Sequence, residues 1–148
     1  MGGMSAYTDP VQTLTVEQSW EHLRSQELGR LVTRVGETID IFPVNYAVDG
    51  DGLLFRTAPG NKLFELTVNE DVLFEVDDHT DTEAWSVVVR GRAQALETDA
   101  DVQRAEGAGL RPWIPTDKRV YVRIVPTSVS GRGFRREPEP DRDGPQEY

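Results

Sequence analysis

The order of strand-like segments is the feature that most constrains the fold of this chain. Six segments rich in β-branched and aromatic residues, each bounded by turn residues, follow one another at short spacing. They are residues 30–35, 38–48, 53–58, 72–77, 85–96 and 119–129. Six closely spaced strands with few helices predict a mainly β protein, an antiparallel barrel rather than a parallel sheet of alternating strands and helices.

Local signals place turns and helices between these strands. The run Asp49-Gly50-Asp51-Gly52 joins two of them, and Asp-Gly pairs between apolar runs are strong hairpin signals. One helix precedes the strands in LTVEQSWEHLRSQELG, where Thr15 and Gln18 have the spacing of a capping box. Gly29 is its expected end. Two shorter helices are expected at 61–67 and around 100–107.

Two residues predict irregularities within the strands. Pro43 cannot donate a hydrogen bond to a sheet ladder, so it indicates a strand edge or a bulge. Gly91, in VVVRGRA, indicates a bend or a close approach of another backbone. Small barrels use such positions to turn their corners.

Composition excludes several classes of function. The formal net charge of −10 argues against nucleic acid as a partner, because phosphate backbones are bound by clustered Lys and Arg. The absence of cysteine excludes disulfides, thiolate zinc sites and cysteine nucleophiles. The longest aliphatic run is three valines at 87–89, whereas a membrane-spanning helix needs about 20 apolar residues. The first residues resemble no signal peptide, and we expect a cytoplasmic protein.

The last residues differ in character from the rest. Residues 137–148, EPEPDRDGPQEY, hold five acids and one arginine, a net charge of −4, with three prolines and no aliphatic residue. Such a segment buries too little surface to offset the entropy lost on ordering. We therefore expect a flexible N-terminus at 1–14, one folded domain at 15–134 and a disordered acidic tail at 135–148.

Hydrolytic and metal chemistry find little support. The sequence lacks the serine elbow, phosphate-loop, dinucleotide and zinc-protease motifs. Of its two histidines, His22 lies in the first predicted helix and is expected at the surface. His79 lies in DDHTDTE, where Asp77, Asp78 and Asp81 could join it around a metal. The same residue types also form ordinary turns between strands.

The stretch LLFRTAPGNKLFEL, residues 53–66, has two interpretations. Arg56 and Thr57 end a strand, and Lys62, one of two lysines in the chain, opens a predicted helix. A cation, a hydroxyl and the free amides of a helix start could together hold an anion such as a phosphate. The alternative is a solvated turn with an ordinary surface lysine.

The order of these motifs resembles a known family. A helix, G-R-L, a strand with Pro43, F-x-T-x-x-x-x-K, and then WSVVVRGRA are similar to the split-barrel flavin-binding proteins related to pyridoxamine 5′-phosphate oxidase. The resemblance covers roughly residues 15–130. It implies a six-stranded antiparallel split β-barrel with Greek-key connections, one N-terminal helix and short peripheral helices. It also implies a homodimer with FMN at two symmetric interface sites.

The resemblance further assigns roles to individual residues. It implies that Arg56, Thr57 and Lys62 hold the FMN phosphate. The residues it places along the ribityl chain and isoalloxazine ring are Pro43, Val44, Asn45 and Tyr46. It also implies that Trp85 and Ser86 line the flavin site. Tyr46 and Trp85 are equally interpretable as core aromatics. Trp113 either covers the partner's flavin or pins a loop, and Arg132 is a candidate to reach the flavin of the other subunit.

The same resemblance leaves the chemistry open. True pyridoxamine phosphate oxidases end in an arginine-containing segment that helps to hold the substrate, whereas this chain ends in Gly133, Phe134 and the acidic tail. This difference argues against pyridoxamine phosphate as the substrate. We expect a flavin-dependent oxidoreductase that transfers a hydride or electrons to a small unidentified substrate. A non-catalytic flavin carrier, a deazaflavin-dependent reductase and a heme-binding relative of the same fold are the alternatives.

Overall fold

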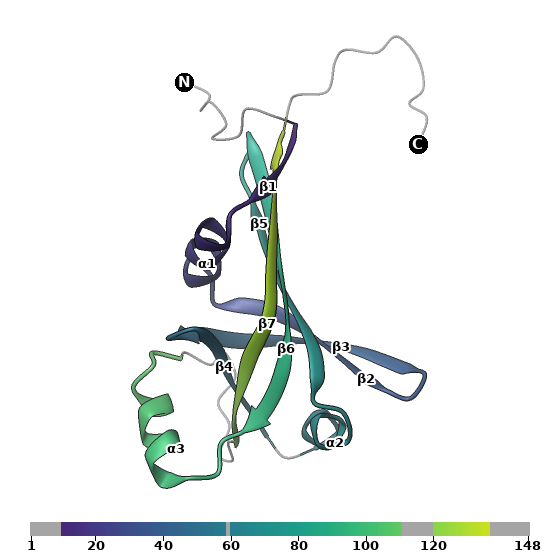
Figure 1. Ribbon diagram of the computed structural model, residues 1–148, viewed down its shortest axis with the longest axis vertical. Coiled ribbons are helices and arrows are strands. Elements are labelled where there is room, and N and C mark those ends of the chain that lie inside the picture. Colours follow the sequence, from purple (N-terminus) through teal and green to yellow (C-terminus); the bar gives the residue numbers. More distant parts are fainter. Residues whose placement is uncertain (1–9, 59, 111–119, 137–148) are drawn as a thin grey trace.

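A computed structural model of the chain describes residues 10–58, 60–110 and 120–136, except for the side chains of residues 61–64. Seven strands and three helices form this part of the chain (Figure 1). In chain order they are β1 (Val11–Leu14), α1 (Val16–Arg24), β2 (Leu28–Val35), β3 (Thr38–Asp49), β4 (Gly52–Thr57), α2 (Asn61–Val68), β5 (Asp71–His79), β6 (Glu83–Ala95), α3 (Asp99–Glu106) and β7 (Val120–Arg135).

Strands β2 to β7 close into an antiparallel barrel. The sheet order is β1-β7-β4-β3-β2-β5-β6, and β6 also pairs with β7, which closes the ring. Three hairpin-connected strands, β2, β3 and β4, are followed by β5, which returns to lie beside β2. This is the Greek-key order. The predicted mainly β fold, with six barrel strands, is confirmed.

Strand β1 is a seventh strand that the sequence analysis did not predict. Residues Val11–Leu14 pair with the last residues of β7, in register from Val11 opposite Phe134 to Leu14 opposite Gly131. The expectation of a flexible N-terminus at 1–14 is therefore wrong for these four residues. Strand β7 is 16 residues long, so the same edge of β7 pairs with β4 near the start of β7 and with β1 near the end of β7.

Helix α1 begins as predicted and ends early. Thr15 Oγ1 accepts from the amide of Gln18 at 3.1 Å, and the amide of Thr15 donates to Gln18 Oε1 at 2.8 Å, which completes the capping box. The predicted end at Gly29 is wrong, because the helix ends at Arg24 and Gly29 lies within β2. Gly29 packs against the ring of Phe74, where a Cβ would lie 2.4 Å from Cε1.

The irregular strand positions behave as predicted. Pro43 pairs with Arg30 of β2, and the ladder between β3 and β4 begins only at Tyr46, so Pro43 lies on an edge. A register shift occurs in β6 between Arg90 and Gly91, and a Cβ at Gly91 would lie 2.5 Å from the carbonyl oxygen of Val125. The two short helices also lie where they were expected.

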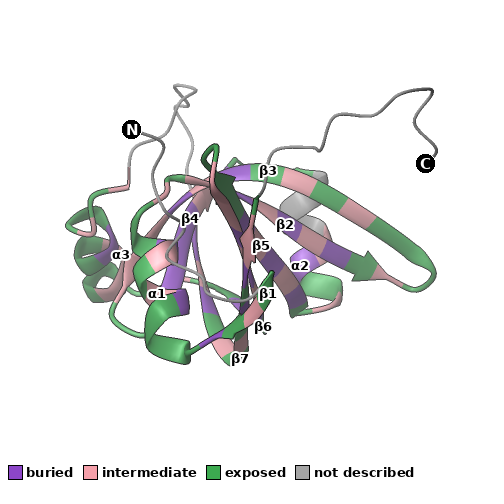
Figure 2. Cartoon of the chain, turned by 90° about the horizontal axis from the view of Figure 1, so that it is seen from above, coloured by how far each residue is buried: buried purple, intermediate pink, exposed green. Residues whose placement is uncertain are grey.

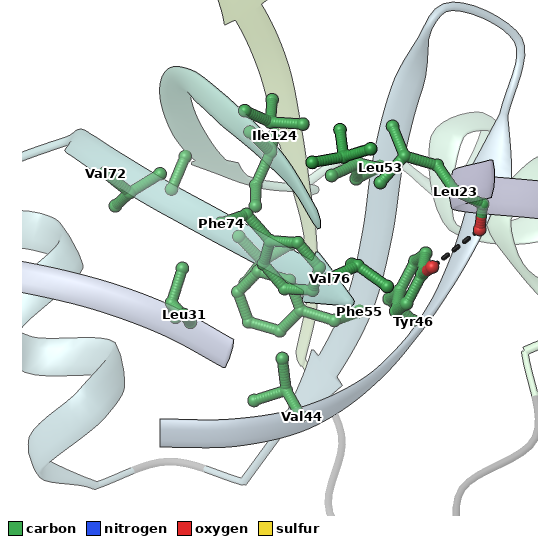
Figure 3. Close-up of a cluster of buried hydrophobic side chains, with 14 of the residues drawn as sticks. Leu23, Leu31, Val44, Tyr46, Leu53, Phe55, Val72, Phe74, Val76 and Ile124 are labelled. Carbon is green, nitrogen blue, oxygen red and sulfur yellow. Dashed lines mark hydrogen bonds between the residues drawn. The ribbon is translucent and has the colours of Figure 1, made fainter. Parts of the chain in front are cut away.

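The barrel interior forms the main core. Buried and exposed residues alternate along the strands, as the period of two requires (Figure 2). Phe55 and Phe74 are the largest fully buried side chains, and Tyr46 packs edge-on against Phe74 (Figure 3). Leu23 of α1 closes one side, and its carbonyl accepts from the Tyr46 hydroxyl at 2.5 Å. None of the helices in the described residues is long and apolar enough to cross a membrane.

Candidate functional site

The end of strand β4 places Arg56 where an anion site was predicted. Arg56 lies opposite Tyr121 of β7, and its guanidinium carbon lies 5.9 Å from the centre of the Tyr121 ring. Its Nε is buried and has no hydrogen-bond partner in the described part of the chain. A buried polar group without a partner costs about 1–3 kcal/mol. This N–H is therefore a donor that fits a bound anion.

Thr57 and the start of α2 continue the same site. Thr57 is buried, and its hydroxyl donates to the carbonyl of Ala58 at 3.2 Å, a contact that rotation of the hydroxyl would release for a ligand. Helix α2 begins at Asn61 after Gly60, and no side chain caps it. Its first amides and the positive end of its dipole favour an anion. Lys62 belongs to this first turn, but its side chain is outside the described residues.

The pleat of β3 divides the four residues that were expected to border a flavin. Val44 and Tyr46 lie in the core, 5% and 3% exposed. Pro43 and Asn45 lie on the outer face. Because Tyr46 pairs with the residue before Arg56, Asn45 and Arg56 lie on the same outer face of neighbouring strands. The structure thus brings Asn45 close to Arg56 and turns Val44 and Tyr46 away from it.

Trp85 is a core residue covered by α1. It is 8% exposed, and its ring stacks on the imidazole of His22 with 4.2 Å between ring centres and 21° between planes. The expectation that His22 is a surface residue is wrong, because this stack half-buries it. Burial lowers the pKa of His22, while Glu83 and Glu21 oppose that shift. The core alternative thus describes both Tyr46 and Trp85 in the single chain.

Ser86 and Arg132 lie together but far from Arg56. They are opposite each other in the ladder of β6 and β7, and both face outward. Arg56 pairs with Tyr121 near the start of β7, whereas Arg132 lies eleven residues farther along it. Eleven residues of extended strand span on the order of 35 Å. Within one chain, Ser86 and Arg132 therefore do not share a site with Arg56.

Two polar pockets flank Asp77 on the outer face. One, of about 380 Å³, is lined by Asp77, His79, Trp85 and Ser86 among others, and the second, of about 470 Å³, by Asp77 and Arg30 among others. Arg30 donates to the carboxylates of Glu75 and Asp77, each at 2.6 Å.

Burial is the main cause that raises the pKa of Glu75, and a hydrogen bond to Asp77 adds to it, while Arg30 opposes the shift. Asp77 and Asp78 line the first pocket, and Arg30 beside the second pocket is paired with Glu75 and Asp77, so these acids disfavour a phosphate at either pocket. His79 is exposed, and in the part of the chain that the structure describes no three His, Asp or Glu residues are grouped to hold a metal. Asp77, Asp78 and His79 lie in strand β5, paired with β6, so the turn interpretation of DDHTDTE holds only for residues 80–82. The predicted Trp113 lies outside the described residues.

Sequence reasoning missed three residues that support Arg56 or helix α2. Tyr121 supports the guanidinium of Arg56. Thr33 of β2 donates from Oγ1 to Glu65 Oε2 at 2.7 Å, which ties α2 to the barrel. No local motif marks these positions, because each depends on the register between elements that are distant in the sequence.

Comparison with known proteins supports the resemblance. The model of the family described as pyridoxamine 5′-phosphate oxidase matches residues 15–133. An uncharacterized protein of Mycobacterium tuberculosis (strain ATCC 25618 / H37Rv), Rv3129, is 54% identical over 95 residues, which are 64% of this chain and 86% of the relative.

Solved structures agree over most of the chain. A protein from Corynebacterium glutamicum is 48% identical with a TM-score of 0.80, over 85% of this chain and 99% of that one. An FAD-binding protein from Mycobacterium smegmatis is 44% identical with a TM-score of 0.73, over 84% and 100%. An FAD-binding protein from Mesorhizobium loti is 27% identical with a TM-score of 0.73, over 83% and 97%. Together with the family match over residues 15–133, these similarities establish that the chain belongs to the pyridoxamine 5′-phosphate oxidase family.

Proposed function

We propose that the protein binds a flavin nucleotide and holds its phosphate between Arg56 and the first turn of α2. The observation that carries this proposal is the buried Nε of Arg56, which has no partner in the described residues. A phosphate needs further donors. These would come from Thr57, from the uncapped start of α2 and from Lys62 in the first turn of that helix. The two FAD-binding relatives, at 44% and 27% identity, support a flavin as the ligand.

FMN and FAD share the group that this site would recognise. In both, a phosphate ends the ribityl chain, and FAD adds a second phosphate and an adenosine. The resemblance in the sequence implies FMN, whereas the names of the two relatives favour FAD. Arg56 and α2 would contact the shared phosphate in either case. Only a titration that compares the affinities of FMN and FAD for the protein distinguishes the two cofactors.

We also propose that the working unit is a homodimer. Ser86 and Arg132 lie on the order of 35 Å from Arg56 along β7, so they join a flavin at Arg56 only if a second copy supplies them. The β2–β3 hairpin extends away from the barrel (Figures 1 and 2). It carries Ile39 and Ile41, which are 67% and 62% exposed and share one face of β3, and contiguous exposed apolar surface is typical of contact surfaces.

The proposed activity is that of an oxidoreductase acting on a small molecule. A bound flavin supplies hydride or electron transfer, and the protein supplies position and electrostatics. Arg56 would neutralise phosphate charge, and Asn45 and Pro43 would border the ligand on the outer face of β3. The polar pocket beside Trp85 and Ser86 is the candidate place for a polar part of the substrate.

In the first step, FMN, FAD and riboflavin are titrated into the purified protein, and flavin fluorescence measures the affinity for each. We expect both nucleotides to bind at least tenfold more tightly than riboflavin, because only they present the phosphate, and a charge-assisted hydrogen bond contributes about 1.5–3 kcal/mol. Equal affinity for all three ligands, or binding of none, would contradict the proposal. The bound flavin is then mixed with NADH, NADPH and reduced deazaflavin. Bleaching by one donor supports the oxidoreductase, and no bleaching favours a flavin carrier.

A further inference from the structure

Helix α2 depends on the barrel for its position. It has eight residues and no side-chain cap at its first turn. Isolated helices shorter than about 12 residues are marginal in water. The direction in which its first turn points is therefore set by the contacts that its later residues make with the strands.

Those contacts converge on β2. Leu66 is 5% exposed and packs into the barrel core. One residue earlier, Glu65 accepts the hydrogen bond from Thr33 at 2.7 Å, and the Thr33 side chain is fully buried. At the end of the helix, Asn69 donates from Nδ2 to the carbonyl of Arg34 at 3.0 Å. Leu66 is held by non-directional packing, so the two hydrogen bonds fix the rotation of the helix.

We propose that Thr33 and Glu65 are positioning residues for the phosphate subsite, because their hydrogen bond aims the first turn of α2 at the ligand held by Arg56. This inference rests on the proposed flavin-nucleotide site. Glu65 lies four residues after Asn61, one helical turn away on the same face of the short helix. A rotation at Glu65 therefore moves the amides and Lys62 of the first turn together.

A third element meets the same contact. Asp40 of β3 lies opposite Thr33 in the β2–β3 ladder. The nearby Asp40 carboxyl group is the largest cause that raises the pKa of Glu65, while Thr33, which donates to the Glu65 carboxylate, opposes the shift. Asp40 thus disfavours the Glu65 carboxylate, and the Thr33 hydroxyl is the donor that stabilises it. The Glu65 carboxyl group is therefore joined to β2 through Thr33.

The experiment compares FMN and riboflavin binding in wild type, Thr33→Val, Thr33→Ser and a control, Thr127→Val. Valine has the shape of threonine without the hydroxyl, whereas serine keeps the donor. Thr127 is exposed on β7 and lines the same pocket as Thr33, but its hydroxyl donates to the carbonyl of Arg90 at 3.2 Å, so it gives the same chemical change without removing a hydrogen bond to α2. Urea unfolding of each variant shows that the fold is retained.

We expect Thr33→Val to weaken FMN binding about tenfold and to leave riboflavin binding unchanged, because the hydrogen bond to a charged group is lost. Thr33→Ser and Thr127→Val should bind FMN like wild type. Equal FMN affinity in Thr33→Val and wild type would overturn the inference, as would an equal loss for FMN and riboflavin. A wild-type protein that does not prefer FMN to riboflavin overturns the phosphate subsite itself, which separates that failure from this one.

Discussion

The stack of His22 on Trp85 joins helix α1 to the barrel wall through one titratable side chain. Burial lowers the pKa of His22 below its ordinary 6.5, against the opposing effects of Glu83 and Glu21. In the unfolded chain the imidazole therefore takes up a proton at higher pH than it does in the fold. Stability contributed by neutral His22 is fully present above about pH 6.5, the pKa of the unfolded chain. It is lost as the pH falls from there through the lower pKa of the folded protein.

We expect the pH dependence of stability to change in His22→Phe, which keeps an aromatic ring against Trp85 but does not titrate. Urea unfolding is monitored by circular dichroism at pH 7.5 and at pH 5.5. When the pH is lowered from 7.5 to 5.5, the urea midpoint should fall less in the variant than in wild type. Other groups contribute equally to both proteins, so the difference reports His22. The same fall in the two proteins would show that His22 does not lose its proton more readily in the fold.

At the level of single residues, the sequence revealed more about the end of β4 than about β3 or β6. Arg56 and Thr57 could be chosen because a strand, a turn and a helix follow one another within ten residues. Tyr46 and Trp85 could not be assigned, because an aromatic residue in a strand faces the core or the outside according to the pleat. The structure turns both of them inward. Tyr121 acts across strands and Thr33 acts between a strand and helix α2, so only the packing of distant elements reveals them.

At the level of elements, signals that depend on local chemistry were reliable. The capping box at Thr15, the edge position of Pro43 and the close approach at Gly91 each follow from a property of one residue type, and all three are confirmed. Gly29 was misread as a helix end, because glycine also allows tight packing, here against Phe74. Strand β1 was missed because four residues carry little pattern and their pairing partner is more than a hundred residues away.

At the level of the whole molecule, the exposed isoleucines of β3 provide a test of the proposed dimer. Ile41→Asp should convert the protein to monomers and weaken flavin binding, because a second copy would no longer supply Ser86 and Arg132. Burial of an isoleucine contributes about 1.5–3 kcal/mol, and a two-fold interface loses it twice. The expected loss is therefore about 3–6 kcal/mol per dimer.

Light scattering across a range of protein concentrations measures this loss. Val16→Asp is the matched control. Val16 is 58% exposed on helix α1, so this substitution introduces the same charge away from the β2–β3 hairpin. A monomeric wild type, or a dimer equally stable in Ile41→Asp and in the control, would contradict the placement of the interface on the β2–β3 hairpin.

The central claim is that the turn from β4 into α2 binds the phosphate of a flavin nucleotide. The substitution Lys62→Ala tests this claim most directly. FMN and riboflavin are titrated into wild type, Lys62→Ala and Arg92→Ala by flavin fluorescence. Arg92 is a control for the loss of a surface cation, because its side chain is 67% exposed and lies on β6. We predict that Lys62→Ala weakens FMN binding about tenfold to a hundredfold, leaves riboflavin binding unchanged and retains the fold, whereas Arg92→Ala binds both like wild type. Tight FMN binding that is the same with and without Lys62 would contradict the claim.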